Sequence, residues 1–368
     1  MDPAHLSRQV RNAWIGCIAL ACFAIVSELG PDSAIIAQAP EMNARNELEF
    51  FLKAHIGLTT GQIASIRRGE PVVKVLPSYT PAEITLIGAV HINAAPQEFL
   101  NLALDMNRLR QLKGYLGAGR LSDPPTLAEL SGFTLEPEDI RSLKTCRPGN
   151  CDVQLPDDTI RTLQRTIDWS RPDAAARVND VLRNLALDML HQYRREGGSA
   201  LDSYYDKKLP FDAHTELRLL LERSDVLPIY LPEGNRYLLE YPKATPEAFD
   251  SLFFWEKVDF GLKPTLRLNH AIAYRSKSRL GSTLVILTKQ LYASHYFQLA
   301  VDLSACVSES ERHSEKGFVL MTVKSSIQQG LTGFKGTLMR GAVVSRTQAA
   351  QEKGLMAIKQ ALETKPVR

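Results

Sequence analysis

The sequence predicts an α+β protein in which a curved antiparallel sheet is covered by a C-terminal helix (helix-grip-like) and interrupted by a large helical insertion. Three observations predict this fold. Apolar and polar residues alternate between 265 and 325, apolar residues recur at helical spacing between 120 and 225, and an amphipathic helix closes the chain. A sheet with one apolar face needs such a cover.

The chain divides into four segments by these patterns. They are an export signal (1–39), N-terminal helices, strands and a helix of the α+β domain (40–119), the helical insertion (120–230), and antiparallel strands with the closing helix (231–368).

The N-terminus has the order of residues that an export signal has. Arg8 and Arg11 precede the apolar run Ala13–Val26, and Ala-Gln-Ala follows at 37–39. The run is shorter than the ~20 residues that a spanning helix needs. A lipid anchor at Cys22 is a weaker alternative, because apolar residues continue past it, and an ordinary N-terminal helix is another. We expect a periplasmic or secreted protein.

The first structural elements alternate between helix and strand. Helical spacing is found over 44–56, a second short helix is expected after Thr59, and strands are expected at 72–76 and 83–92. The second strand places four aliphatic residues on one face, with a glycine between them: Ile84, Leu86, Gly88, Val90 and Ile92. A turn at 93–96 then leads into an amphipathic helix.

In residues 120–225, apolar residues recur mainly at helical spacing. The longest helix carries apolar residues from Val178 to Tyr193 and stops at Gly197-Gly198. From 265 onward the alternation predicts strands, including a long stretch at 283–307 with a bulge near Ala293 and another strand at 318–325. Leu355, Ile358 and Leu362 mark one face of the last helix.

Two resemblances follow from short segments. The strand, "INAAP" turn and helix at 83–104, together with the strand series and the ending "GLMAIKQALE", resemble START-like (helix-grip) lipid-binding domains. That resemblance implies a ligand cavity between sheet and last helix. The segments "CRPGNC", "YLPEGNRYLLEYP" and "QLYASHYF" resemble an uncharacterised family of exported bacterial proteins, which implies no activity.

Cys146 and Cys151 flank a Pro-Gly turn. In an oxidising compartment such a pair predicts a disulfide that pins a loop. Redox-active cysteine pairs typically have the spacing C-x-x-C at the start of a helix, which differs from the spacing here. Free or redox-active thiols and a metal site are the weaker alternatives.

Six residues are candidates to line the predicted cavity. His270 and His295 fall on apolar strand faces, and Lys289 shares the alternation of His295. The full set is His270, Tyr274, Lys289, His295, Phe297 and Trp255. A histidine and a lysine there would orient a polar head group or act as acid and base, although a histidine on an apolar face is more often a packed core residue. Trp255 fits a core anchor or a lid, and Tyr292 and Tyr296 fit a solvated sheet face.

Composition and motifs exclude several classes. Without 1–39 the chain carries 42 basic and 38 acidic residues, from 44 and 41 in the whole chain, a balance too even for nucleic-acid binding. The sequence has no G-x-S-x-G, Walker, H-E-x-x-H or dinucleotide motif. Four acidic residues lack a neighbouring histidine: Asp105, Glu136, Glu138 and Asp139. We expect neither a cofactor nor a metal.

These observations favour an exported, monomeric protein that binds a hydrophobic small molecule or lipid in an internal cavity. Peripheral association with a membrane is compatible with that role. One alternative is an enzyme of the cyclase or hydrolase type that uses His270 or His295 in the same cavity. The other is a non-catalytic envelope protein that docks through the helical block.

Overall fold

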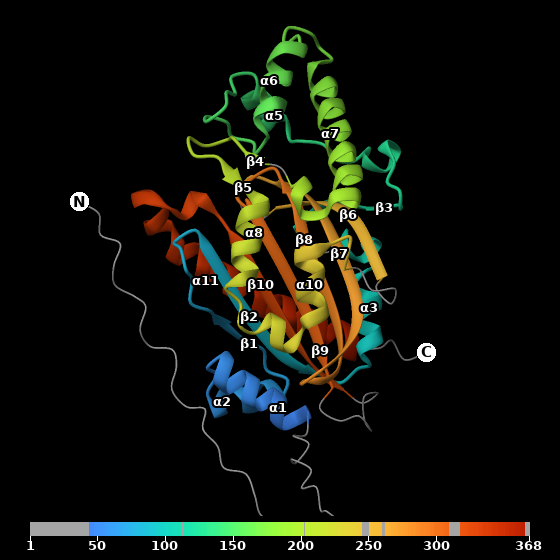
Figure 1. The fold of residues 1–368 in the computed structure, drawn as a ribbon, viewed down its shortest axis with the longest axis vertical. Helices are drawn as coiled ribbons and strands as arrows, with labels where there is room; N and C mark the ends of the chain where they lie inside the picture. The colour runs from blue at the N-terminus through green and yellow to red at the C-terminus, as the bar shows by residue number, and fades with distance from the viewer. Residues whose placement is uncertain are drawn as a thin grey trace, which may run out of the picture. The chain divides into compact units, whose positions relative to one another are not determined.

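An eight-stranded antiparallel sheet runs through the domain (Figure 1). Its order is β1-β2-β10-β9-β8-β7-β6-β3, and every neighbouring pair is antiparallel. The strands are β1 (Val72–Val75), β2 (Glu83–Ile92), β3 (Tyr115–Leu121), β6 (Asp250–Val258), β7 (Thr265–Ser278), β8 (Gly281–Ala293), β9 (Leu299–Val307) and β10 (Phe318–Ile327).

The structure, a computed structural model, describes residues 44–111, 114–201, 203–244, 250–259, 262–308 and 317–364. The predicted export signal at 1–39, with Cys22, lies outside these residues.

Short helices precede and follow the first two strands. They are α1 (Ala44–Phe50), which continues as a π-helical turn (Phe51–His55), α2 (Thr60–Arg67), α3 (Pro96–Ala103) and α4 (Met106–Leu109). Thr59 caps α2 as predicted, because its hydroxyl accepts from the Gln62 amide and the Gln62 side chain accepts from the Thr59 amide.

A helical layer is inserted between β3 and β6. Its helices are α5 (Pro137–Leu143), α6 (Asp157–Thr166), α7 (Ala174–Glu196), α8 (Ala213–Glu222), α9 (Leu227–Tyr230) and α10 (Pro232–Glu240). It also holds a two-stranded ribbon, β4 (Ser203–Tyr204) and β5 (Phe211–Asp212), and 3₁₀ turns at Leu127–Leu130 and Gly197–Ala200. The layer therefore continues past residue 230, through α10.

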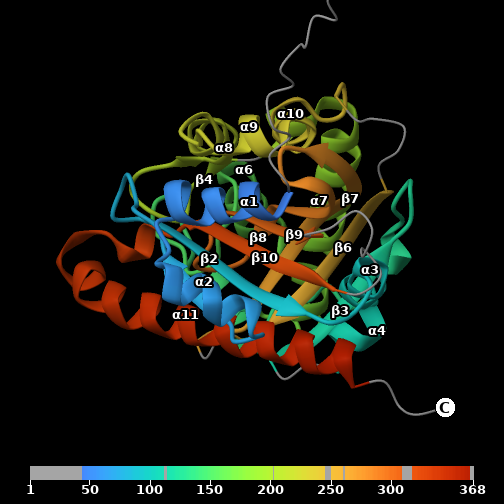
Figure 2. The same ribbon diagram turned by 90° about the horizontal axis from the view of Figure 1, so that it is seen from below.

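The sheet lies between two helical layers (Figure 2). Helices α8–α10 cover one face, and the last helix α11 (Gly333–Glu363), which follows a 3₁₀ turn (Gln329–Leu331), lies on the other. We call these the block face and the α11 face. Helix α10 packs closely on the block face because Gly234 has no side chain, and a Cβ there would lie 2.4 Å from the Tyr274 hydroxyl oxygen.

Helix α11 lies against β2 and β10. A Cβ on Gly88 of β2 would lie 2.8 Å from a methyl of Leu355, so the glycine permits this close approach. The Gln351 amide of α11 also donates to the Thr322 carbonyl of β10 at 3.1 Å. The predicted aliphatic face of β2 packs here, with Ile84, Leu86, Val90, Ile92, Leu355 and Leu362 in one apolar cluster.

The α+β fold with a large antiparallel sheet and a C-terminal helix is therefore confirmed. The expected cover of its apolar strand face is wrong. Leu266, Leu268 and Ile272 of β7 pack with the helical insertion, whereas α11 packs with a different set of strand residues. Both faces of the sheet bury apolar residues, so one apolar face does not identify the side on which the last helix lies.

Candidate functional site

Four of the six predicted cavity residues, His270, Tyr274, Lys289 and Trp255, lie on the block face. They pack beneath the helical insertion and not opposite α11, which corrects the expected lining of the cavity. The reason is that the inserted helices themselves need an apolar surface to bury.

His270 joins the sheet to α7 and α10. Its Nδ1 lies 3.2 Å from the Tyr193 hydroxyl and 2.8 Å from the Tyr237 hydroxyl, and its Nε2 lies 2.8 Å from the Ser251 hydroxyl. Burial, followed by the charge of Lys289, holds the pKa of His270 well below its usual range. His270 is therefore a neutral, hydrogen-bonded core histidine.

Lys289 is buried beside this histidine, with 1 % of its surface exposed. Its Nζ donates to the Leu238 carbonyl at 3.4 Å and lies 4.8 Å from the centre of the Tyr193 ring. Burial lowers the pKa of Lys289 to about 7. A buried amine with one long hydrogen bond destabilises the fold. Substituting Lys289 should therefore change the free energy of unfolding measurably.

Trp255 is the core anchor that the sequence suggested. Its Nε1 donates to the Glu129 carbonyl at 3.0 Å. Its ring lies against Gly119 and Gly132, where a Cβ would lie 2.3 Å and 2.6 Å from ring atoms. The two glycines make room for the indole between β3 and the insertion.

Tyr292 was expected on a solvated face, and this is wrong. A register shift at Leu268 and Asn269 leaves Leu291 of β8 without a partner on β7. Tyr292 then pairs with Leu268 and lies buried on the block face.

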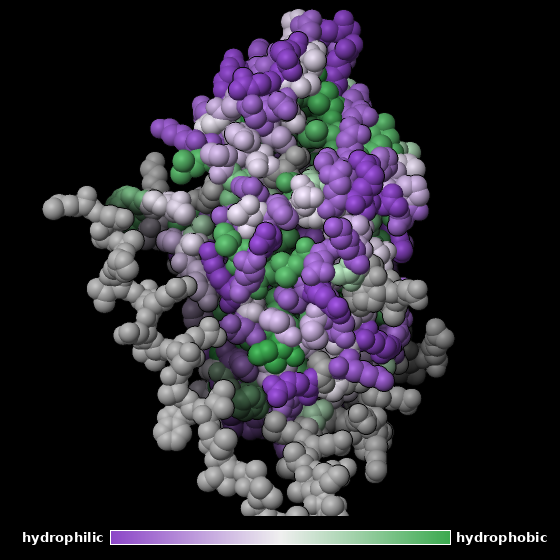
Figure 3. All heavy atoms as spheres, in the orientation of Figure 1, coloured by the Kyte–Doolittle hydropathy of each residue, from purple (hydrophilic) through white to green (hydrophobic). Residues whose placement is uncertain are grey.

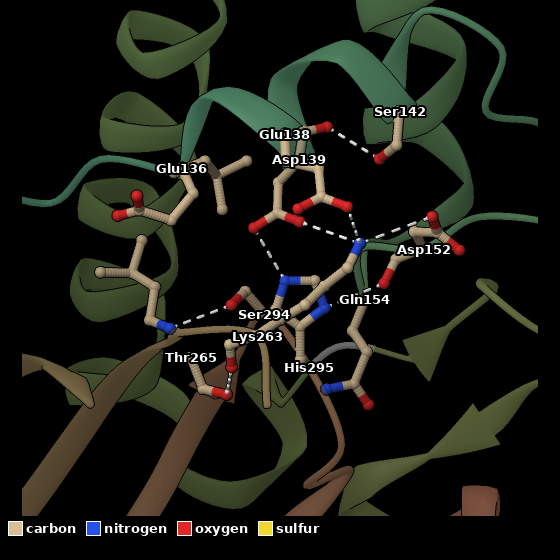
Figure 4. Close-up of polar contacts among 12 residues, drawn as sticks. Glu136, Glu138, Asp139, Ser142, Asp152, Gln154, Lys263, Thr265, Ser294 and His295 are labelled. Atoms are coloured by element: carbon tan, nitrogen blue, oxygen red, sulfur yellow. Dashed lines mark hydrogen bonds and ion pairs between the residues drawn. The ribbon is translucent and has the colours of Figure 1, made fainter. Parts of the chain in front are cut away.

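His295 is held by a second cluster, at the turn between β8 and β9 (Figure 4). Its Nε2 lies 2.9 Å from Asp139 Oδ2, and its Nδ1 lies 3.0 Å from the Asp152 carbonyl oxygen. The carboxylate and the carbonyl are hydrogen-bond acceptors, one at each ring nitrogen. Asp139 thus has a histidine partner, 156 positions along the chain, which the sequence analysis missed.

Lys263 adds a positive charge to this cluster. Its Nζ lies 3.4 Å from Asp139 Oδ1 and 3.7 Å from Asp152 Oδ2 (Figure 4). Burial alone would raise the pKa of Asp139, but the hydrogen bond and charge of His295, then Lys263, lower it below its usual range. With both His295 nitrogens engaged, the cluster is suited to holding α5 on the sheet.

The predicted disulfide is confirmed and lies beside this cluster. Cys146 and Cys151 are bonded and buried, and Asp152 follows directly. The loop between them also donates from Gly149 to the Tyr205 carbonyl at 2.6 Å. The closed loop thereby positions the Asp152 carbonyl that accepts from His295.

A polar network on the α11 face escaped the sequence analysis. Arg267 contacts Glu256 at 3.0 Å and donates from Nε to Gln290 Oε1 at 3.1 Å. Asn269 donates to Glu256 Oε1 at 3.2 Å. The signal was the polar half of the alternation in 265–275, to which the sequence analysis gave no role.

Phe297, the sixth candidate, belongs to this network. Its half-buried ring lies 5.8 Å from the Arg267 guanidinium, and its carbonyl accepts from Gln290 at 2.9 Å. Asn269 is 0 % exposed, and within the described part of the chain its Oδ1 accepts no hydrogen bond. A buried acceptor of this kind is costly unless a partner arrives.

Solvent reaches the α11 face next to this network. Thr288 and Ser304 lie on the central strands β8 and β9 and are half-buried, and Lys324 of β10 is exposed. Ser304 pairs with Thr322, and Thr322 contacts Gln351 of α11. Thr288, Ser304 and Lys324 therefore lie on the α11 face. This face therefore has polar side chains at the surface next to the buried network.

On the block face, the surface of the helices shows hydrophilic and hydrophobic side chains in interspersed groups (Figure 3). Among the described residues, no group of three or more His, Cys, Asp or Glu side chains is arranged to hold a metal ion. No helix in the described ranges is long and apolar enough to cross a membrane.

Comparison with known proteins gives no relative: no family model, curated protein or solved structure matches the chain.

Proposed function

We propose that the chain is a helix-grip binding protein, which holds a hydrophobic small molecule or lipid between the α11 face of the sheet and α11. The observation that carries the proposal is the buried network of Glu256, Arg267, Asn269 and Gln290 on this face, beside side chains that solvent reaches.

The order of elements supports the helix-grip assignment. After the edge strand β1, the chain runs through β2, two short helices, β3, then β6 to β10 and α11. The strands from β3 to β10 lie in sequence across the sheet, and β10 returns to pair with β2. START-like domains have a first strand, two helices, a meander that closes on that strand, and a final helix.

The chemistry of the face supports an apolar ligand with one polar end. Asn269 offers an unused acceptor and Arg267 a cation, while Leu252, Phe254 and Ala271 lie in an apolar cluster next to them. A few polar groups in an apolar lining are typical of small-molecule sites, where they fix the orientation of the ligand.

The enzymatic alternative has less support. An acid or base needs a ring nitrogen that reaches substrate, and both nitrogens of His270 and of His295 are bonded to protein groups. The disulfide Cys146–Cys151 supports the proposal that the mature chain works in an oxidising compartment, the periplasm or the exterior.

The test is native mass spectrometry of the purified chain with a panel of lipids and apolar metabolites. Ser304→Trp places a large ring on the half-buried part of the α11 face and should abolish the ligand-bound peaks. Ser170→Trp, at an exposed turn before α7, is the matched control and should keep them. If no ligand binds the unmodified chain, or Ser304→Trp binds as well as the control, the proposal is wrong.

A further inference from the structure

The first turns of α11 expose large apolar side chains. Phe334 is 83 % exposed, Leu338 71 % and Met339 52 %. Phe334 and Leu338 are one turn apart and share a face of the helix, with Met339 beside them. We call these three residues the α11 tip; this end of the helix extends beyond the strands (Figures 1 and 2).

A loop beside the tip adds an aromatic side chain. Arg340 donates to Ser78 Oγ at 3.0 Å, to the Glu83 carbonyl at 2.9 Å and to the Pro81 carbonyl. These bonds fix residues 77–82 against α11. Tyr79 in this loop is 68 % exposed. The tip therefore lies beside a loop that is hydrogen-bonded to α11.

The segment that carries the tip is basic in sequence, although Lys324 is paired with Asp302 of β9 and Glu83 lies near Arg223. Between residues 317 and 351 the sequence has four basic residues, Lys324, Lys335, Arg340 and Arg346, and no Asp or Glu. Arg223, at the end of α8, lies over the Tyr79 ring at 5.1 Å. A second copy of the chain would bring like charges together here, whereas an anionic surface would be attracted.

We infer that the α11 tip docks the protein on an anionic lipid bilayer. Exposed Phe, Leu and Met enter the boundary between head groups and acyl chains, an aromatic ring lies at head-group depth, and basic residues meet the lipid phosphates. The inference rests on exposure and charge at the tip, so it does not depend on a ligand bound inside the protein.

The experiment places an indole at the tip of the full chain. Phe334→Trp is compared with Leu209→Trp, a position 76 % exposed in the loop before β5. Both are mixed with vesicles of phosphatidylcholine, with or without phosphatidylglycerol, that carry brominated acyl chains. Both variants share the same N-terminal residues, so any binding through residues 1–43 contributes equally.

We expect bromine to quench the indole of Phe334→Trp in anionic vesicles and to leave that of Leu209→Trp unchanged. Adding Leu338→Ser and Met339→Ser should reduce partitioning about tenfold, whereas the matched pair Leu116→Ser and Ile229→Ser, also exposed, should not. Equal quenching of the two indoles, or none, would overturn the inference. So would a dimer in ultracentrifugation that the tip substitutions dissociate, since a second copy would then cover the tip.

Discussion

The two faces of the sheet bury polar groups in different ways. On the block face, both ring nitrogens of His270 are bonded to protein groups, although the buried Tyr292 hydroxyl there has no partner among the described residues. On the α11 face, Asn269 is fully buried and keeps an unused acceptor, next to strand residues that solvent reaches. A satisfied polar cluster stabilises a fold, whereas a buried acceptor without a partner is suited to a ligand.

Removing the charge of Asp139 should have the largest effect on stability. Asp139→Asn removes the buried carboxylate that His295 and Lys263 contact, at a cost of about 3 kcal/mol in urea unfolding at pH 7. Because the folded pKa of Asp139 is lowered, its contribution is present above the usual value of 3.8 and is lost as pH falls through the folded pKa. Glu138→Gln removes an exposed partner of Lys263 and should cost little. Equal losses in the two variants would contradict the cluster's role.

Lys289→Met should stabilise the block face by about 1–4 kcal/mol at pH 7, because a buried amine is replaced by a side chain of similar size. The pKa of Lys289 is about 7 when folded and 10.5 ordinarily, so above pH 7 the unfolded chain binds a proton that the folded chain does not. Stability of the unmodified chain should therefore rise with pH by up to about 1.4 kcal/mol per unit.

The pH series for Lys289 is best measured from pH 7 to 8.5. Above that range the raised pKa of the Cys306 thiol and of buried tyrosines such as Tyr193 opposes the rise. The difference between the unmodified chain and Lys289→Met isolates the lysine. A difference that does not change with pH would mean that the amine is charged in the folded state.

Opening the disulfide should have a smaller effect. Cys146→Ser with Cys151→Ser frees a short loop, which costs about 2 kcal/mol by loop entropy. It should also weaken the His295 cluster, because Asp152 follows Cys151 and supplies its carbonyl. In a double-mutant cycle, Asp139→Asn should therefore cost less without the disulfide than with it. Strictly additive losses would show that the loop does not position Asp152.

Local pattern predicted many elements of this fold. The alternation in β2 and the glycine at 88 placed its aliphatic residues on one face, and that face packs against α11. The spacing around Pro148-Gly149 predicted the disulfide. These features depend on residues that are close in sequence, where period and turn chemistry suffice.

The rest depended on contacts between distant segments. The alternation in β7 places His270 and Asn269 on opposite faces of the sheet. It does not say which helical layer covers which face. Asp139 and His295 are brought together only by the packing of α5 on the sheet. The unpaired Leu291 changed the side on which Tyr292 lies, and no residue type in β8 marks that position.

The most direct test of the difference between the faces is the fraction of ligand-bound protein in native mass spectra of two variants. Asn269→Leu removes the unused acceptor on the α11 face, and Lys289→Met changes the block face at a position of similar burial. We predict that Asn269→Leu lowers bound ligand at least about tenfold, as expected when a hydrogen bond at a buried site is lost, while Lys289→Met leaves it unchanged. Ligand loss in Lys289→Met alone would contradict the account and move the binding site to the block face.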